Sequence, residues 1–316
     1  MNPLPPDRAT LLTEQRNPAS MNLHALSVRE IVDLIQEEDR EVFRAMKRAR
    51  RPIADLISAA EPGFLAGGRL VYVGAGTSGR LGVLDASEAP PTFCVPQGRV
   101  IGLIAGGDAA LRRSSEGLED DPGGVWNELE PLGLGENDTV IAVTAGGTTP
   151  YALGALHLCK TRLAEGRRPL TALIACVNIP RPGDADHLVV LKTGPEVLTG
   201  STRMKAGTAT KMTLNIISTT LMIRSGRVHE NLMVDVRATN DKLRDRAARI
   251  ISSLTGLSRS RSFDLLERSG GEVKTAVVMH ETGLGPEQAA AALAGLNGRL
   301  ADAIVPRQGA RATGPS

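Results

Sequence analysis

Five short apolar runs in the first two-thirds of the chain constrain its fold more than any other sequence feature. They lie at 70–73, 99–104, 139–144, 170–176 and 188–191. The runs are largely continuous in apolar residues and do not alternate between apolar and polar, which is typical of strands buried on both faces. Helical stretches follow most of them, so the pattern predicts an α/β fold, a doubly wound parallel sheet covered by helices on both sides.

The same sequence pattern divides the 316 residues into four parts. An N-terminal arm and helix occupy 1–51; Ser27 followed by Glu30 forms a capping box, and a second helix is expected over 53–60, ending at Pro62. The α/β domain spans 52–225. A small helical region covers 226–305, and a Gly-, Pro- and Arg-rich tail at 306–316 is predicted to be disordered. The expected helices beyond the first loop are one that follows Gly79 and ends at about Ser87, and those at 150–163, 207–224, 240–255, 262–269, 273–280 and 286–293.

Charge and aromatic content exclude several classes of partner. The 37 basic and 35 acidic residues are nearly balanced, with a formal net charge of +2, which argues against a general binder of nucleic acid or a membrane surface. One Trp, two Tyr and four Phe are too few for a stacking platform for bases. We expect a globular protein with no nucleic-acid partner.

Cysteine and histidine usage argues against disulfides and metals. The three cysteines are widely spaced without a Cys-x-x-Cys pair, and the five histidines are scattered. We therefore expect no metal site. The first residues contain Pro and Asp where a leader would be basic, and no run approaches the roughly 18 apolar residues needed to span a bilayer. The predicted location is the cytoplasm, away from membranes.

The stretch 74–79 has the spacing G-x-G-x-x-G between an expected strand and helix. A dinucleotide site would also need an acidic residue about 20 positions further on. After the second expected strand the first acidic residue is Asp108, 34 positions from Gly74, which disfavours a nucleotide. The loop instead suits a phosphate, because unpaired N–H groups at a helix N-terminus attract anions.

Hydroxyl groups recur at three expected helix starts, which is the strongest sign of a phosphate site. A simple capping role is the alternative for each of them. Convergence of all three on one anion predicts a phosphosugar ligand without a nucleotide. The candidate binding residues are Gly76, Thr77 and Ser78 in the first loop, Thr148 and Thr149 before Pro150 in the second, and Ser201, Thr202 and Lys205 in the third.

Two groups of carboxylates lie near these loops in the sequence. Glu88 is expected at the end of the helix after the first loop, where a negative charge opposes the helix dipole. Glu116, Glu119, Asp120 and Asp121 follow the second strand, and a solvated acidic helix start is the competing interpretation there. Two carboxylates beside a phosphosugar can divide the roles of acid and base when their environments separate their pKa values.

Several longer motifs resemble N-acetylmuramic acid 6-phosphate etherases, a family related to glucokinase regulatory protein. They are TEQRNPAS at 13–20, VYVGAGTSGRLGVLDASEAPPTF at 71–93, GLIAGGD at 102–108, GPEVLTGSTRMKAGTATK at 194–211 and NLMVDV at 231–236. The resemblance runs from about residue 11 to 305. It implies a sugar isomerase (SIS) domain, a cytoplasmic homodimer and a part in cell-wall sugar recycling.

The resemblance also implies a carbon–oxygen lyase reaction that releases D-lactate and N-acetylglucosamine 6-phosphate without a cofactor. The family's acid is the glutamate of Asp-Ala-Ser-Glu, which corresponds to Glu88. Its base corresponds to Glu119, in Glu116-Gly117-Leu118-Glu119-Asp120. On this basis Glu88 is expected to protonate the lactyl oxygen, and Glu119 to remove the C2 proton.

The chain departs from the family pattern in its second loop. The usual Ser-Gly-Arg-Thr-Pro-Tyr is replaced by Gly-Gly-Thr-Thr-Pro-Tyr at 146–151, so one expected hydroxyl is missing at Gly146 and an arginine at Thr148. Two other functions use the same fold: a phosphosugar sensor that regulates a partner protein, and an aldose–ketose isomerase. The pair of glutamates and the family motifs favour the lyase over both.

Overall fold

The computed structural model describes residues 11–113, 116–236 and 240–304. It contains two compact units, one formed by residues 1–89 with 96–221 and the other by residues 90–95 with 222–316. The predicted tail at 306–316 and the first ten residues of the N-terminal arm lie outside the described residues.

A five-stranded parallel sheet forms the centre of the first unit. Its strands are β1 (Leu70–Gly74), β2 (Val100–Ile104), β3 (Thr139–Val143), β4 (Leu170–Ala175) and β5 (His187–Val190). Their order is β2-β1-β3-β4-β5, and all four pairings are parallel. The predicted strands and the doubly wound sheet are therefore confirmed.

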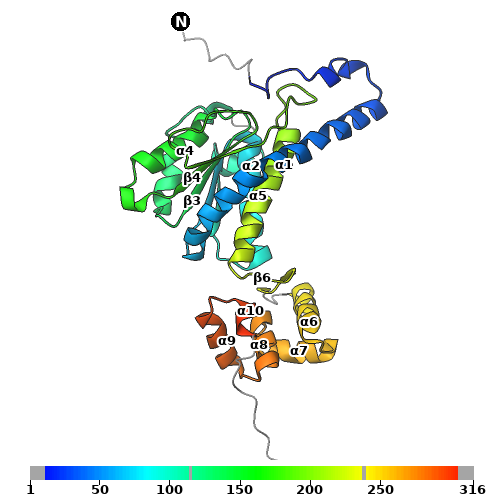
Figure 1. Cartoon of the computed structure of the whole chain (residues 1–316), viewed down its shortest axis with the longest axis vertical. Helices are drawn as coiled ribbons and strands as arrows, with labels where there is room; N and C mark the ends of the chain where they lie inside the picture. Colours follow the sequence, from blue (N-terminus) through cyan, green and yellow to red (C-terminus); the bar gives the residue numbers. More distant parts are fainter. Residues whose placement is uncertain (1–10, 114–115, 237–239, 305–316) are drawn as a thin grey trace, which may run out of the picture. The chain divides into compact units, whose positions relative to one another are not determined.

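Helices cover both faces of this sheet, as continuous apolar strands require. The helices of the first unit are α1 (Val28–Leu65), α2 (Gly76–Phe93), α3 (Trp126–Leu129), α4 (Pro150–Thr161) and α5 (Lys205–Arg224). Val71, Val73 and Val140 pack with α4 in one apolar cluster. Tyr72 points to the opposite face and reaches Asp85 on α2. Figure 1 shows α4 on one side of the sheet and α1, α2 and α5 on the other.

The predicted break after the first helix is wrong, because α1 runs continuously through Pro52 and Pro62. A proline inside a helix removes a hydrogen bond and normally destabilises it. Here the buried stripe of α1 continues past Pro52 without interruption, so burial outweighs that cost. Its buried residues are Val42, Ala45, Ala49, Ile53, Leu56, Ile57, Ala60 and Phe64.

Helix α2 also extends further than expected, because it continues past Ser87 through Pro90 and Pro91 to Phe93. Ala86 and Ala89 remain buried on its inner face. Glu88 consequently lies within the helix and not at its end. The N–H of Cys94 closes the helix on the carbonyl of Pro90 at 2.9 Å.

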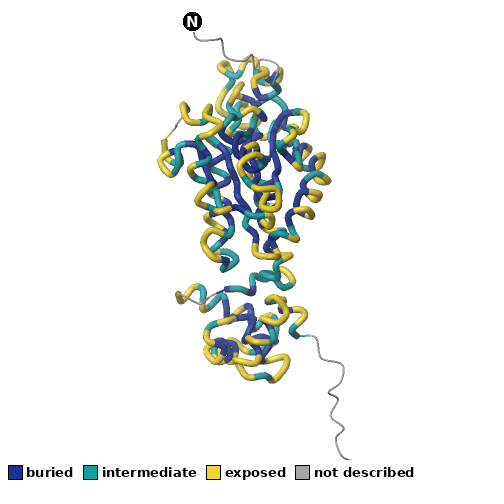
Figure 2. The backbone as a smooth tube through the Cα atoms, turned by 90° about the vertical axis from the view of Figure 1, so that its left-hand side faces the viewer, coloured by how far each residue is buried: buried dark blue, intermediate teal, exposed yellow. Residues whose placement is uncertain are grey.

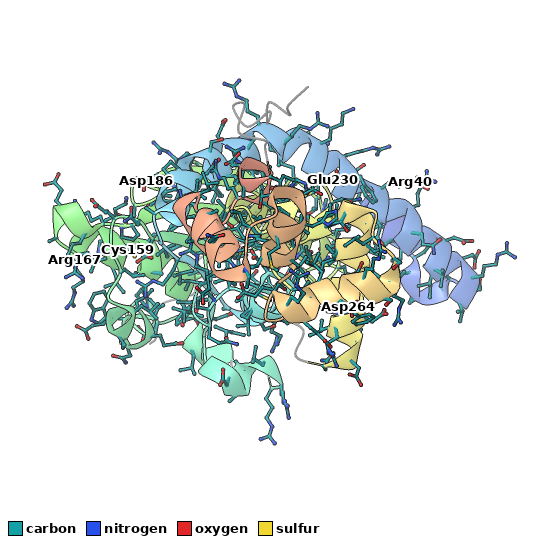
Figure 3. The ribbon with its side chains drawn as sticks, turned by 90° about the horizontal axis from the view of Figure 1, so that it is seen from below. Arg40, Cys159, Arg167, Asp186, Glu230 and Asp264 are labelled. Carbon is teal, nitrogen blue, oxygen red and sulfur yellow. The ribbon has the colours of Figure 1, made fainter. Side chains whose placement is uncertain are left out.

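One partly exposed polar junction connects α4 with the start of the last two strands. Asp186, labelled in Figure 3, accepts hydrogen bonds from the backbone N–H of Thr171 at 2.9 Å and from Lys160 Nζ at 2.7 Å. The ion pair with Lys160 and these hydrogen bonds hold the pKa of Asp186 below its usual value, although burial alone would raise it. This junction anchors the sheet edge far from the candidate loops.

The second unit is a small helical bundle with a two-stranded hairpin. Its elements are α6 (Asp241–Thr255), α7 (Arg259–Arg268), α8 (Val273–Thr282), α9 (Pro286–Gly295), α10 (Leu300–Ala303), β6 (Val228–His229) and β7 (Leu232–Met233). The four long helices match the predicted ones to within a few residues. The hairpin was not predicted because two-residue strands carry no periodicity. Figure 2 shows buried backbone at the centre of each unit.

Candidate active site

The strand order locates the expected ligand crevice. From β1 the chain crosses to β2 on one side, and from β3 it crosses to β4 on the other. In such sheets ligands bind outside the carboxyl ends of the strands at this switch point. The last residues of the two strands, Gly74 and Val143, are paired. The loops that follow them are therefore neighbours, and both carry candidate phosphate-binding residues.

The first loop forms an open helix N-terminus. Gly76 begins α2 with φ at +52°, a left-handed conformation that favours glycine. A side chain on Gly79 would lie 2.7 Å from the carbonyl oxygen of Gly74, so the glycines let the helix start against the strand. The first N–H groups of a helix have no acceptor within it. With the half-buried hydroxyls of Thr77 and Ser78, these groups form an arrangement that suits an anion.

The second loop places two threonines at the start of α4. The predicted start is confirmed, with Thr149 as N-cap and Pro150 as the first helical residue. The Thr149 side chain makes no capping hydrogen bond. Gly147 has φ at +73°, and its N–H donates to the Thr144 hydroxyl at 2.8 Å. The loop is thus held by Thr144, and Thr148 is exposed beside it.

Gly146 leaves room where the family pattern has serine. A Cβ at this position would lie 3.7 Å from Leu11 Cδ1 and Thr148 Oγ1, and 3.8 Å from Thr13 Oγ1, which are ordinary contact distances. Thr13 is buried, with 1% of its surface exposed. Sequence reasoning did not select Thr13 as a site residue, although it begins one of the family-like motifs. The structure adds it to the edge of the second loop.

The third hydroxyl-rich segment differs from the first two. The buried carboxylate of Glu196 accepts hydrogen bonds from the N–H groups of Lys205 at 3.0 Å and Ala206 at 2.9 Å. The first N–H groups of α5 therefore already bind an anion from the protein itself. Ser201 and Thr202 remain half-buried ahead of the helix.

Lys205 also has an internal partner. Its ammonium lies 2.6 Å from Glu38 Oε2, and its side chain is only 2% exposed. Asn17 Nδ2 donates to the same carboxylate oxygen at 2.6 Å. Burial would raise the pKa of Glu38, but the Lys205 and Asn17 contacts hold it below the usual value. Glu38 and Glu196 were missed from sequence because neither lies in a recognisable local pattern with Lys205.

The starts of α2 and α5 are close together. A side chain on Gly207 would lie 3.4 Å from Thr77 Cγ2 and from the carbonyl oxygen of Thr202. The structure thus brings together Thr77 and the 202–207 turn, next to the loop after β3. Lys205 is the one charged residue among the predicted binding residues, and its ammonium is already paired with Glu38 within the chain.

The two candidate glutamates lie at opposite ends of the sheet. The carbonyl of Glu119 accepts a hydrogen bond from the N–H of Tyr151 at 3.0 Å, which places this half-buried residue beside the start of α4. Glu88 is exposed near the far end of α2. The structure therefore brings Glu119 to the candidate phosphate loops but does not bring Glu88 there within one chain. Nothing is described for the Glu116 side chain.

Two negative findings apply to the part of the chain that the structure describes. No group of three or more His, Cys, Asp or Glu side chains there is arranged to hold a metal ion. Within the same residues, every helix is too short or too polar to cross a membrane.

The second unit contains a cavity of about 400 Å³ with a charged wall. Asp235 Oδ2 lies 3.2 Å from Arg227 Nη1 and 2.9 Å from Lys274 Nζ, and Lys274 also donates to the Gly298 carbonyl at 2.7 Å. Desolvation lowers the pKa of Lys274. The family-like motif at 231–236 thus contributes to the core and cavity of this unit.

Comparison with known proteins agrees with the resemblance seen in the sequence. The family model for the glucokinase regulatory protein N-terminal SIS domain matches residues 52–160. The N-acetylmuramic acid 6-phosphate etherase of Thermosynechococcus vestitus is 53% identical over 87% of this chain and 88% of its own length. That of Trichormus variabilis is 50% identical over 94% of this chain and 96% of its own. Among solved structures, a phosphoheptose isomerase from Neisseria gonorrhoeae is 13% identical with a TM-score of 0.43, covering 61% of this chain and 97% of that one.

Proposed function

Because the chain belongs to the N-acetylmuramic acid 6-phosphate etherase family, we propose that it cleaves the D-lactyl ether of N-acetylmuramic acid 6-phosphate. The products are D-lactate and N-acetylglucosamine 6-phosphate, and the reaction belongs to cell-wall sugar recycling. The observation that carries this proposal is the 50% identity to such an etherase over 94% of the chain. The open helix N-terminus at the switch point of the sheet supports a phosphosugar as the ligand.

The chemistry proceeds by elimination and then addition of water. In the open-chain sugar the C1 aldehyde makes the C2 proton acidic. A base removes that proton, the C3–oxygen bond breaks, and an acid protonates the departing lactyl oxygen. Water then adds its oxygen to C3 of the unsaturated aldehyde while C2 regains a proton. Each glutamate can reverse its role in this second half, so the protein is unchanged at the end.

We assign the base to Glu119 and the acid to Glu88. The backbone contact between Glu119 and Tyr151 supports the first role, because it holds the residue beside the phosphate loops. The phosphate is assigned to Gly76, Thr77 and Ser78, with help from Thr148 and Thr149. Ser201 and Thr202 are assigned to the edge of the same phosphate site. Lys205 is proposed to position the start of α5 through its ion pair with Glu38 instead of contacting phosphate.

The protein is further proposed to act in the cytoplasm as a homodimer. Several large apolar side chains are exposed on the helices of the first unit, including Phe43 at 68% and Leu84 at 50%. Exposed apolar surface of this kind is what a subunit interface covers. The helical second unit is assigned no separate activity.

The test is D-lactate release from N-acetylmuramic acid 6-phosphate by the purified protein. Release is expected from the wild type, with losses of about 100- to 10,000-fold in Glu88→Gln and Glu119→Gln. Formation of a ketose phosphate would instead favour an isomerase, and tight phosphosugar binding without turnover would favour a sensor. Full activity in both glutamine variants would contradict the assigned roles.

A further inference from the structure

The cavity of the second unit is formed by that unit alone. Its volume is about 400 Å³. The residues that line it, from Cys94 to Gly298, all belong to the second unit, whereas the phosphate loops belong to the first. The cavity is therefore a feature of one folded body, and its chemistry is separate from that of the loops.

The charged wall of the cavity contains more positive than negative charge in its buried part. Arg227 and Lys274 both line it, and they share one carboxylate, Asp235, at 3.2 Å and 2.9 Å. The remaining charged residue of the wall, Glu272, is exposed, and its Oε2 accepts a hydrogen bond from Thr275 Oγ1 at 3.0 Å. Because water and salt screen an exposed carboxylate, two cations face a single partly buried anion.

Lys274 has a hydrogen-bond donor to spare. Its side chain is only 10% exposed. An ammonium group has three N–H donors, and two of them are used, by Asp235 Oδ2 at 2.9 Å and the Gly298 carbonyl at 2.7 Å. No third acceptor for this ammonium occurs among the residues that the structure describes. A buried donor without an acceptor is unfavourable, and an anion in the cavity would supply one.

The rest of the lining favours a ligand that is both anionic and partly apolar. The first turn of α8 lies in the wall, and its N-cap residue, Glu272, makes no side-chain capping hydrogen bond. The first N–H groups of a helix have no acceptor within it and favour negative charge. Val234, Leu293 and Ala294 supply apolar surface to the same cavity.

We propose that this cavity is a second ligand site, which binds a small organic carboxylate. One negative charge balances the surplus cation of the wall, whereas a phosphate dianion would exceed it. A carboxylate also accepts two parallel hydrogen bonds from a guanidinium group such as that of Arg227. Its other contact is the third N–H of Lys274, and its apolar part packs against Leu293. The site exists whether or not the chain cleaves a lactyl ether.

A thiol in the wall allows the occupancy of the cavity to be measured. Cys94 lines the cavity and is half-buried, while Cys159 and Cys176 are fully buried. Iodoacetamide should therefore label Cys94 first, and mass spectrometry gives the rate, with Cys94→Ser as the check on the labelled position. If benzoate or D-lactate binds with a dissociation constant of about 1 mM, 10 mM of it should slow the labelling of the full chain about 10-fold. Unchanged labelling with both carboxylates would overturn the site, and stronger protection by inorganic phosphate would overturn the carboxylate assignment.

Variants of Arg227 test the cationic wall. Arg227→Gln should abolish protection by benzoate, and Arg227→Lys, which keeps the charge, should retain part of it. The matched control is Arg268→Gln, because Arg268 is an exposed arginine of the same unit that is not part of the cavity wall. Thermal unfolding verifies that each variant is folded. Full protection in Arg227→Gln, or none in Arg227→Lys, would contradict a carboxylate bound at this wall.

Discussion

The ammonium of Lys205 lies 2.6 Å from the carboxylate of Glu38, joining the first turn of α5 to the first third of α1 across 167 residues of sequence. The Lys205 side chain is 2% exposed, so little water reaches its ammonium group. The ion pair fixes the position of the third loop at the start of α5. Removing one partner of a buried pair leaves the other charge without compensation.

We expect Glu38→Ala to destabilise the protein by about 3 kcal/mol, because Lys205 would remain buried without its counter-charge. Urea unfolding followed by circular dichroism measures the change. The matched control is Glu37→Ala, since Glu37 pairs with Arg40 on the exposed side of the same helix. An equal effect of the two substitutions would show that the ion pair contributes no more than a surface pair.

Gly146→Ser should lower KM for the phosphosugar while leaving kcat nearly unchanged. The position has room for a side chain, with the nearest atoms at 3.7 Å, and serine adds a hydroxyl at the second loop. The neighbouring Gly147→Ser is the control, because that residue has φ at +73° and a Cβ would lie 2.7 Å from Ile179 Cδ1. Gly147→Ser should reduce the melting temperature. A raised KM in Gly146→Ser would contradict a phosphate contact there.

Thr77→Val and Ser78→Ala should each weaken phosphosugar binding by roughly 10-fold, the effect of losing one hydrogen bond to a charged group. Isothermal titration with N-acetylglucosamine 6-phosphate, the product, provides the affinity without turnover. Thr208→Val serves as control, because the hydroxyl of the exposed Thr208 on α5 donates to the carbonyl of Met204, the residue before the helix. Unchanged affinity in both loop variants would place the phosphate elsewhere.

Stability should fall in acid below about pH 4, the ordinary range of an unfolded aspartate. Burial would raise the pKa of Asp138, but hydrogen bonds from Arg69 and the Gly135 N–H, with the Arg69 charge, hold it lower. A group with a lowered folded pKa contributes stability above its unfolded pKa and loses it as pH falls through the folded value.

Calorimetric melting between pH 7 and pH 2.5 measures this loss. Asp138→Asn should be less stable than the wild type at pH 7 and should lose less further stability below pH 4. Arg69 Nη2 lies 2.7 Å from Asp138 Oδ2, so the substitution removes an ion pair as well as a titrating group. If the melting temperature falls with pH as steeply in Asp138→Asn as in the wild type, the acid sensitivity arises from other carboxylates, such as Glu38 and Asp186.

The five strands, the parallel sheet and the start of α4 were predictable from the chain alone, because they depend on apolar continuity and on the local preferences of Thr149 and Pro150. The motifs also point to Glu88 and Glu119, and the roles of these two residues stay predictions. The break at Pro52 was wrongly predicted because local propensity does not record the burial of Ile53 and Leu56 against the sheet.

Which side chains and N–H groups are free to bind a ligand depends on contacts between distant parts of the fold. The pairing of Lys205 with Glu38 and of the α5 N-terminus with Glu196 joins residues that no local pattern relates. The separation of Glu88 from Glu119 follows from the direction of α2, which starts at one end of the sheet and finishes at the other. Glu88 and Glu119 are 31 positions apart in the sequence, but the distance between them in space depends on how α2 packs against the strands.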